Sequence, residues 1–289
     1  MKEKTTPARY ELRRKMLRRF WRNRLAVIGT TVVMMYVFCA IFAPCLSPMD
    51  PLQQSLKDKR QPPTSTHLLG TDQFGRDILS RLLYGSRYAL LVSSFAVFVS
   101  LSVGTLLGMT AGCLGHAVDE CIMRIMDMLL AFPYLLLAIL IVTAMGPGVW
   151  NTIIAIGVWG IPIFARQTRG AVLNIRDREF IQAAQAIGAS LPRIMARHLL
   201  PNIIAPLIVY AALYMGYAIL MESALTFLGL GIQPPTPSWA EMIASGRNFM
   251  TVAPHIATIP GLAIMFATLG FNLIGDGLRD ALDPRRSML

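Results

Sequence analysis

The chain is poor in charged residues and in cysteine. Only 15% of its 289 residues are charged, whereas 54% are hydrophobic and the mean hydropathy is positive at +0.52. This composition excludes an ordinary soluble domain. None of the four cysteines has the paired spacing of a metal site, so we expect free thiols and no disulfide framework: Cys39, Cys45, Cys113 and Cys121.

The sequence also lacks the motifs of ATP hydrolysis and of zinc catalysis. A phosphate-binding loop needs Gly-Lys-Ser or Gly-Lys-Thr after a glycine-rich turn, and none of the lysines follows a glycine. The histidines show no HExxH-like spacing, so no catalytic or metal site is expected. Any ATP-driven process would therefore need a separate subunit that binds ATP and Mg²⁺.

The formal charge of +11 is unevenly distributed. Ten of the 27 Lys and Arg residues lie in the tail 1–24, directly before an apolar segment. Such a run is a topology signal and an anchor to anionic lipid, and it does not indicate nucleic-acid binding.

Long apolar segments predict an all-α membrane protein with six transmembrane helices. Residues 25–43 carry no charge and would form about 28 Å of helix, enough to cross a bilayer. A Pro-rich extracytoplasmic loop follows at 44–87, in which Asp77 caps a helix and turn formation explains Asp72 better than a metal does. The rest, 88–289, is predicted to contain the other five spans: 88–112, 122–145, 149–165, 203–225 and 256–275.

The distribution of Lys and Arg predicts the orientation. With the N-terminus inside, the inner side holds ten in the tail, six in 166–201 and three at the C-terminus. The outer side holds six in the long 44–87 loop and one in 226–255. Both termini and 166–201 are therefore expected to be cytoplasmic.

Three charged residues fall within predicted spans. Arg124 and Asp127 are spaced i, i+3 and are expected to pair with each other, which favours a structural role over a substrate site. Glu222 lies near the outer end of the fifth span, where a lone carboxylate is costly and by default functional. It would line the translocation path, hold an outer gate, or pair with Arg247, and we favour the structural roles.

The most informative stretch is 179–201, which is polar and basic but lies between apolar spans. Phe180, Ala183, Ala184 and Ile187 have helical spacing, and Gly188 then interrupts the pattern. Ser190 and Pro192 are typical of the start of a second helix. The pattern predicts two short amphipathic helices joined by a glycine turn, presented in water to a partner.

These residues carry a family resemblance. The EAA loop of ABC importer permeases is matched by Gln182, Ala183, Ala184, Gly188, Leu200 and Pro201, although the family usually has Glu in place of Gln182. Four further motifs agree: FWRNR at 20–24, HLLGTDQFGRD at 67–77, QPPTPSW at 233–239 and FNLIGDGLRDALDP at 271–284. The chain resembles, over nearly its whole length, the second (C-type) permease of the peptide, nickel and glutathione importers.

The resemblance implies the type I importer permease fold in a bacterial or archaeal cytoplasmic membrane. It implies a second, homologous permease, two ABC ATPase subunits that bind ATP and Mg²⁺, and an extracytoplasmic solute-binding protein. The loop 166–201 would couple the ATPases to the spans, and Gly188 would permit its sharp turn. The chain itself would have no catalytic residue, metal or cofactor.

Two other classes remain as alternatives. An integral-membrane enzyme needs catalytic groups that converge at one depth, and the spans offer only Glu222 near one face and the pair Arg124 and Asp127 near the other. A channel or secondary transporter would be expected to show inverted repeats or more polar groups at the midplane. Within the importer interpretation, peptides fit best, and nickel and glutathione are the alternatives.

Overall fold

The computed structural model describes residues 16–282 of the 289-residue chain. Within this range it is helical apart from loops and an isolated bridge between Thr71 and Asp77. Residues 1–15 of the predicted basic tail and residues 283–289 lie outside the described range; residues 16–22 are helical.

Five helices are long and apolar enough to cross a membrane. The first begins after the N-cap Asn23, whose side chain accepts hydrogen bonds from the backbone N–H groups of Leu25 and Ala26. The five comprise α2 (Arg24–Leu46), α3 (Ile78–Leu114), α6 (Val149–Leu173), α9 (Leu200–Phe227), which continues the short helix α8 (Leu191–Ile194) without a break, and α11 (His255–Leu282).

The predicted third span, 122–145, is not one helix. It consists of α4 (His116–Ala131) and α5 (Tyr134–Met145), which meet at 92°. Pro133 lies at the break, and proline disfavours helical backbone in the residue before it and lacks an N–H donor. If this bent pair counts as one span, the described residues contain six, as predicted.

The predicted external loop is shorter than expected, because α3 begins at Ile78 and runs unbroken for 37 residues. Its N-cap is Asp77, whose carboxylate accepts a hydrogen bond from the Ser80 N–H at 2.8 Å, as predicted. Three short elements lie outside the spans here: the 3₁₀ turn Leu56–Asp58 and, after α9, helix α10 (Trp239–Gly246) with the 3₁₀ turn Arg247–Phe249.

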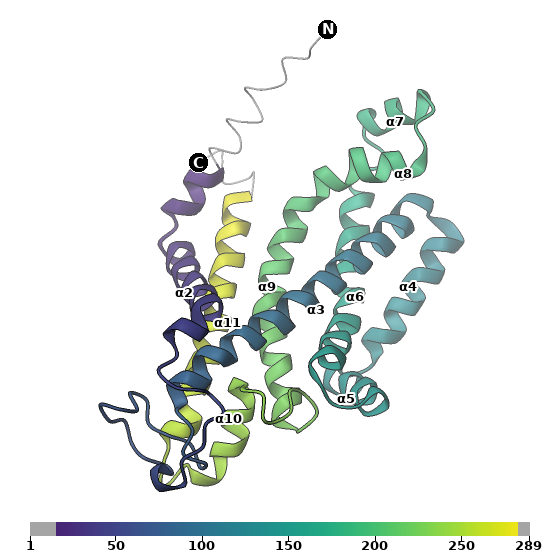
Figure 1. Ribbon diagram of the computed structural model, residues 1–289. Coiled ribbons are helices and arrows are strands. Elements are labelled where there is room, and N and C mark those ends of the chain that lie inside the picture. Colours follow the sequence, from purple (N-terminus) through teal and green to yellow (C-terminus); the bar gives the residue numbers. More distant parts are fainter. Residues whose placement is uncertain (1–15, 283–289) are drawn as a thin grey trace.

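The chain alternates between two ends of the bundle (Figure 1). Helices α7 (Glu179–Ala186) and α8 (Leu191–Ile194) lie at one end, together with the start of α2 and the end of α11. We call this the elbow end. Residues 47–77, α5 and α10 lie at the opposite end, here called the loop end. The start of α2, the end of α11 and the elbow thus lie at the same end, as the predicted topology requires, and the side of the membrane on which this end lies stays a prediction.

Glycines hold the two most extensively packed helices, α3 and α6, close together. A Cβ atom added at Gly104 would lie 2.6 Å from the Phe164 Cβ, and one at Gly108 would lie 2.7 Å from the Thr168 Cβ. The small-xxx-small spacing of these glycines therefore does permit close helix approach, as expected.

Candidate functional site

The elbow is built as the glycine spacing predicted. Gly188 has φ +75°, which lies in the left-handed region. Its N–H donates to the Gln185 carbonyl at 2.9 Å, and the Ala189 N–H donates to the Ala184 carbonyl at 3.0 Å. These two bonds form a Schellman motif that ends α7 and turns the chain into α8.

The second helix of the elbow is not short. Helix α8 continues through a π-helical segment, Met195–Leu199, directly into α9. A π segment is a rare local widening and often marks a functional position. Leu200 and Pro201, the last residues of the EAA-like motif, are therefore the first residues of α9 and lie within the candidate span Leu191–Phe227. The elbow is thus continuous with α9.

The buried face of α7 differs from the predicted one. Ile181 and Ala184 are buried against Ile194, Leu199 and other apolar residues at the elbow end. Phe180 and Ile187, expected on the same apolar face, are exposed by 40% and 85%. The helix has only eight residues and rests on the bundle through one narrow edge, so its second apolar edge faces outward.

The other residues of the EAA-like motif are likewise divided between exposed and buried positions. Ala183 and Gln182 are exposed on α7, and the Gln182 side-chain amide donates to the Asp177 carbonyl at 3.1 Å. Leu200 is half-buried and Pro201 exposed at the start of α9. The elbow thus presents Phe180, Ala183 and Ile187 to its surroundings, while Ala184 anchors it.

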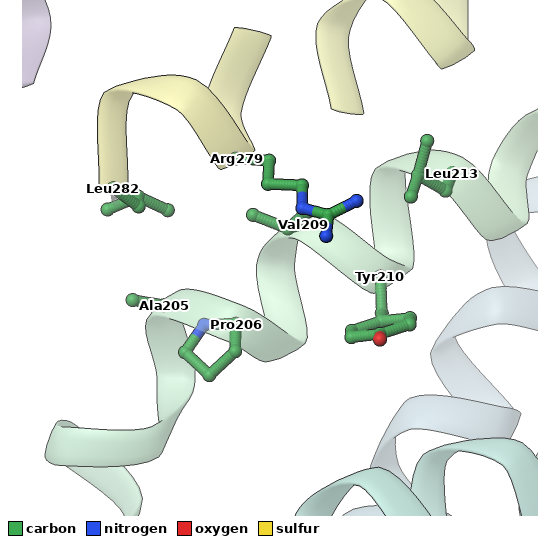
Figure 2. A pocket seen from close by; sticks show the side chains of 7 residues that line it. All are labelled: Ala205, Pro206, Val209, Tyr210, Leu213, Arg279 and Leu282. Atoms are coloured by element: carbon green, nitrogen blue, oxygen red, sulfur yellow. The ribbon is translucent and has the colours of Figure 1, made fainter. Parts of the chain in front are cut away.

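A cavity of about 320 Å³ separates the first turns of α9 from the last turns of α11. Figure 2 shows Arg279 reaching from α11 across this space toward α9, where Pro206, Val209 and Tyr210 line it. Proline inside a helix removes one backbone hydrogen bond and is a common cause of bending. The elbow therefore leads into a segment of α9 that is loosely packed on one side.

Glu222 is buried at the loop end of α9 and does not pair with Arg247. Its carboxylate accepts hydrogen bonds from the Thr226 hydroxyl at 2.9 Å and the Ser238 hydroxyl at 3.3 Å. The Thr226 hydroxyl in turn accepts from the Ile232 N–H at 3.1 Å. The Arg247 guanidinium instead lies over the Phe227 ring, 5.4 Å from its centre. Glu222 therefore ties the loop before α10 to α9. The predicted pair with Arg247 is wrong, and a role in the translocation path or its gate stays a prediction.

The predicted pair of Arg124 and Asp127 does not form. The Arg124 guanidinium is 3.5 Å from the Glu120 carboxylate, and the Asp127 carboxylate is 2.5 Å from the Arg166 guanidinium on α6. In a helix, i and i+4 are as close as i and i+3, and the orientation of α4 turns Asp127 toward α6. Arg169, one turn along α6 from Arg166, contacts Asp119 through two bonds at 2.5 and 2.6 Å.

Sequence reasoning missed a buried ionic cluster at the loop end. The guanidinium of Arg81, which is fully buried in α3, contacts the Glu241 carboxylate of α10 at 2.5 Å and lies 3.7 Å from Asp72. Asp72 also binds Arg76 at 2.6 Å, and the Asp77 carboxylate contacts the His67 ring at 3.0 Å. The motif HLLGTDQFGRD supplies four of these side chains, but its partner in α10 is distant in sequence.

The described residues contain no group of three His, Cys, Asp or Glu side chains placed to hold a metal ion. All four cysteines are free thiols, as predicted.

The helical bundle, its bent third span and its protruding elbow define a multi-pass membrane protein of the permease class. Residues 104–288 match the family described as binding-protein-dependent transport system inner membrane component. Residues 11–63 match the N-terminal transmembrane domain of oligopeptide transport permease C. The chain belongs to this family of inner-membrane permeases.

Characterised relatives cover nearly all of the chain. The dipeptide transport system permease protein DppC of Alkalihalophilus pseudofirmus is 46% identical over 94% of this chain and 90% of its own length. The di/tripeptide permease DppC of Pseudomonas aeruginosa is 45% identical, with 93% and 92% covered. The glutathione permease GsiD of Pectobacterium atrosepticum is 42% identical, with 94% and 91% covered.

A solved structure shows the same fold. An inward-facing MetNI methionine ABC transporter matches with a TM-score of 0.57 at 16% identity, over 70% of this chain and 97% of that one. The chain is thus a multi-pass permease subunit of an ABC importer in the bacterial inner membrane, and ATP hydrolysis belongs to separate subunits.

Proposed function

We propose that this permease imports short peptides. The proposal is carried by the names of the relatives. Two are permeases for dipeptides or tripeptides, and the third is a permease for glutathione, itself a small peptide. The working complex contains a second, homologous permease, two ATPase subunits that bind ATP and Mg²⁺, and an extracytoplasmic solute-binding protein that delivers the peptide.

Coupling to the ATPases is assigned to the elbow. Its outward edge carries Phe180, Ala183 and Ile187, and the 85% exposure of Ile187 leaves an apolar side chain for a partner to cover. Gly188 sets the angle between α7 and α8, while Ala184 seats the elbow on the bundle. Leu200 and Pro201 pass its movement to α9, and Gln182 lies on the exposed surface near the docking edge.

The coupling proposal is tested with Ile187→Asp. A charge at the centre of an apolar contact is expected to cost about 2 kcal/mol or more, which is about thirtyfold in affinity. The ATPase should then be lost when the permease is purified from its native membrane in mild detergent. Val252→Asp, at a 73% exposed apolar side chain of the loop end, is the matched control and should keep the ATPase.

The substrate is tested by uptake into cells that express the complete importer. Labelled dipeptide should accumulate, excess unlabelled dipeptide or glutathione should compete, and Ni²⁺ should not. Uptake of nickel without uptake of peptide would contradict the peptide assignment. Retention of the ATPase by Ile187→Asp would contradict the docking edge.

A further inference from the structure

A second cavity lies near the elbow end, between α4 and α6, and has a volume of about 620 Å³. Its lining is mostly ionisable. Helix α4 supplies Asp119, Glu120, Met123 and Asp127, and α6 supplies Arg166 and Arg169. The volume is in the range of small-molecule sites.

The charges in this cavity form two ion pairs of different character. Arg169 holds Asp119 through two bonds, and these side chains are 35% and 16% exposed. Arg166 holds Asp127 through one bond at 2.5 Å, and these side chains are 52% and 56% exposed. Exposed pairs contribute about 0–1 kcal/mol, so the second pair can exchange partners with a charged ligand at little cost.

The charged face of α4 is incompatible with lipid chains. Helices α4 and α5 together have the length and hydropathy of a span, and Met126 is the single buried residue among the sixteen of α4. Charged side chains within spans face the protein interior or a water-filled space and not hydrocarbon. We therefore expect this face of α4 to border water.

The pattern of charge fits a solute that carries both signs. A guanidinium binds a carboxylate well, and a carboxylate binds an ammonium group. Three carboxylates, two guanidiniums and the His116 ring line the cavity. The third carboxylate, Glu120, lies 3.5 Å from the Arg124 guanidinium in an exposed pair, which can likewise exchange partners with a cation at little cost. A short peptide with free termini presents an ammonium at one end and a carboxylate at the other.

We propose that this cavity is a binding station for the termini of the peptide on the inner part of its route. The ammonium contacts Asp127 and Glu120, the carboxylate contacts Arg166, and the pair of Arg169 and Asp119 holds α4 against α6. This inference rests on the proposed import of peptides and assigns substrate contacts to residues outside the elbow.

The test uses a thiol reporter that leaves both ion pairs intact. In the complete importer with the four native cysteines replaced by serine, Met123→Cys lies in the cavity. Met128→Cys on the same helix, 59% exposed and outside the lining, is the matched control. Inverted membrane vesicles are treated with a membrane-impermeant maleimide, with and without a free dipeptide added directly, so the solute-binding protein is not needed.

The dipeptide should slow modification of Met123→Cys and leave Met128→Cys unchanged. At about four times the Kd, occupancy predicts a rate about fivefold lower. In the same background, Asp127→Asn should weaken protection by the free dipeptide. The N-acetylated dipeptide lacks the ammonium. It should therefore protect Met123→Cys only weakly, and to the same extent whether position 127 carries the native Asp or the substitution Asp127→Asn.

Three results would overturn the inference: Met123→Cys that does not react, equal rates with and without dipeptide, or equal protection at both positions. Dipeptide uptake by the parent importer is measured in parallel. Normal uptake without protection refutes the binding station alone. Absence of both uptake and protection refutes the peptide function and the station with it.

Discussion

At Gly188 a single backbone angle determines the direction in which the elbow turns from α7 into α8. A Cβ atom at this position would have no other atom within 4 Å, so space does not require glycine there. The requirement comes from φ +75°, where a residue with a side chain costs about 1–2 kcal/mol, and more if it is β-branched.

We therefore expect Gly188→Val to straighten or reposition the elbow. Dipeptide uptake should fall at least about tenfold, the equivalent of about 1.4 kcal/mol, while ATP hydrolysis by the complex and membrane insertion persist. Uptake and ATPase activity are measured in reconstituted vesicles. Gly261→Val is the control, because Gly261 lies within helix α11 with ordinary φ and its nearest neighbour for a Cβ is 4.0 Å away. Normal uptake by Gly188→Val would remove the elbow from the coupling route.

Arg81 is the residue on which the loop end depends most. Its side chain is fully buried and joins α3 to α10 through Glu241 and to the 47–77 loop through Asp72. Removing one member of a buried pair leaves the other charge uncompensated, which typically costs about 3–5 kcal/mol.

Arg81→Met should accordingly lower the thermal unfolding midpoint of the detergent-solubilised permease markedly. Arg87→Met, an exposed position on the same helix, should change it little. The double variant Arg81→Met with Glu241→Gln should recover part of the loss, because the orphaned carboxylate is gone. A midpoint equal to that of Arg87→Met would show that the ion pair is not stabilising.

Among the elements, α3 and α6 form the pair whose contact depends most on small residues. A Cβ at Gly108 would lie 2.7 Å from the Thr168 Cβ, inside the range that real contacts avoid. Overpacking of this kind costs about 1–3 kcal/mol, so Gly108→Val should lower the unfolding midpoint. Ala117→Val, exposed on α4, is the control and should leave it unchanged. Equal midpoints would mean that the two helices can separate freely.

The elements also mark the limit of what sequence could predict. The hydrophobic runs located every span because burial in lipid demands an apolar length. The 92° break at Pro133 was missed because a proline does not always interrupt a helix: Pro162 and Pro206 lie within helices that stay continuous. The face of α7 was misjudged because periodicity identifies apolar edges but not which edge meets the bundle. The partner of Asp127 lies 39 residues away on α6, beyond any local rule.

At the scale of the whole molecule, the helices run between two ends of one bundle. Fixing the side of the membrane that one end faces therefore fixes the orientation of the whole protein. The Lys and Arg bias predicts that the elbow end is cytoplasmic. In a background without native cysteines, Gln185→Cys on the elbow should react with an impermeant maleimide in inverted vesicles and not in right-side-out ones. Ser65→Cys in the 47–77 loop should show the opposite pattern. Reversal of these patterns would invert the topology and detach the elbow from the cytoplasmic ATPases.

The ionic cluster at the loop end has a consequence for the order in which the protein is made. Arg81 and Glu241 are separated by 160 residues. At about 5–20 residues per second, a ribosome takes about 8–32 s to synthesise that interval. Of the two carboxylates that lie next to Arg81 in the folded protein, only Asp72 has been made during this time. The loop end is therefore among the last parts of the permease to mature, and a nascent chain that stalls before α10 leaves its most deeply buried guanidinium without its main counter-ion.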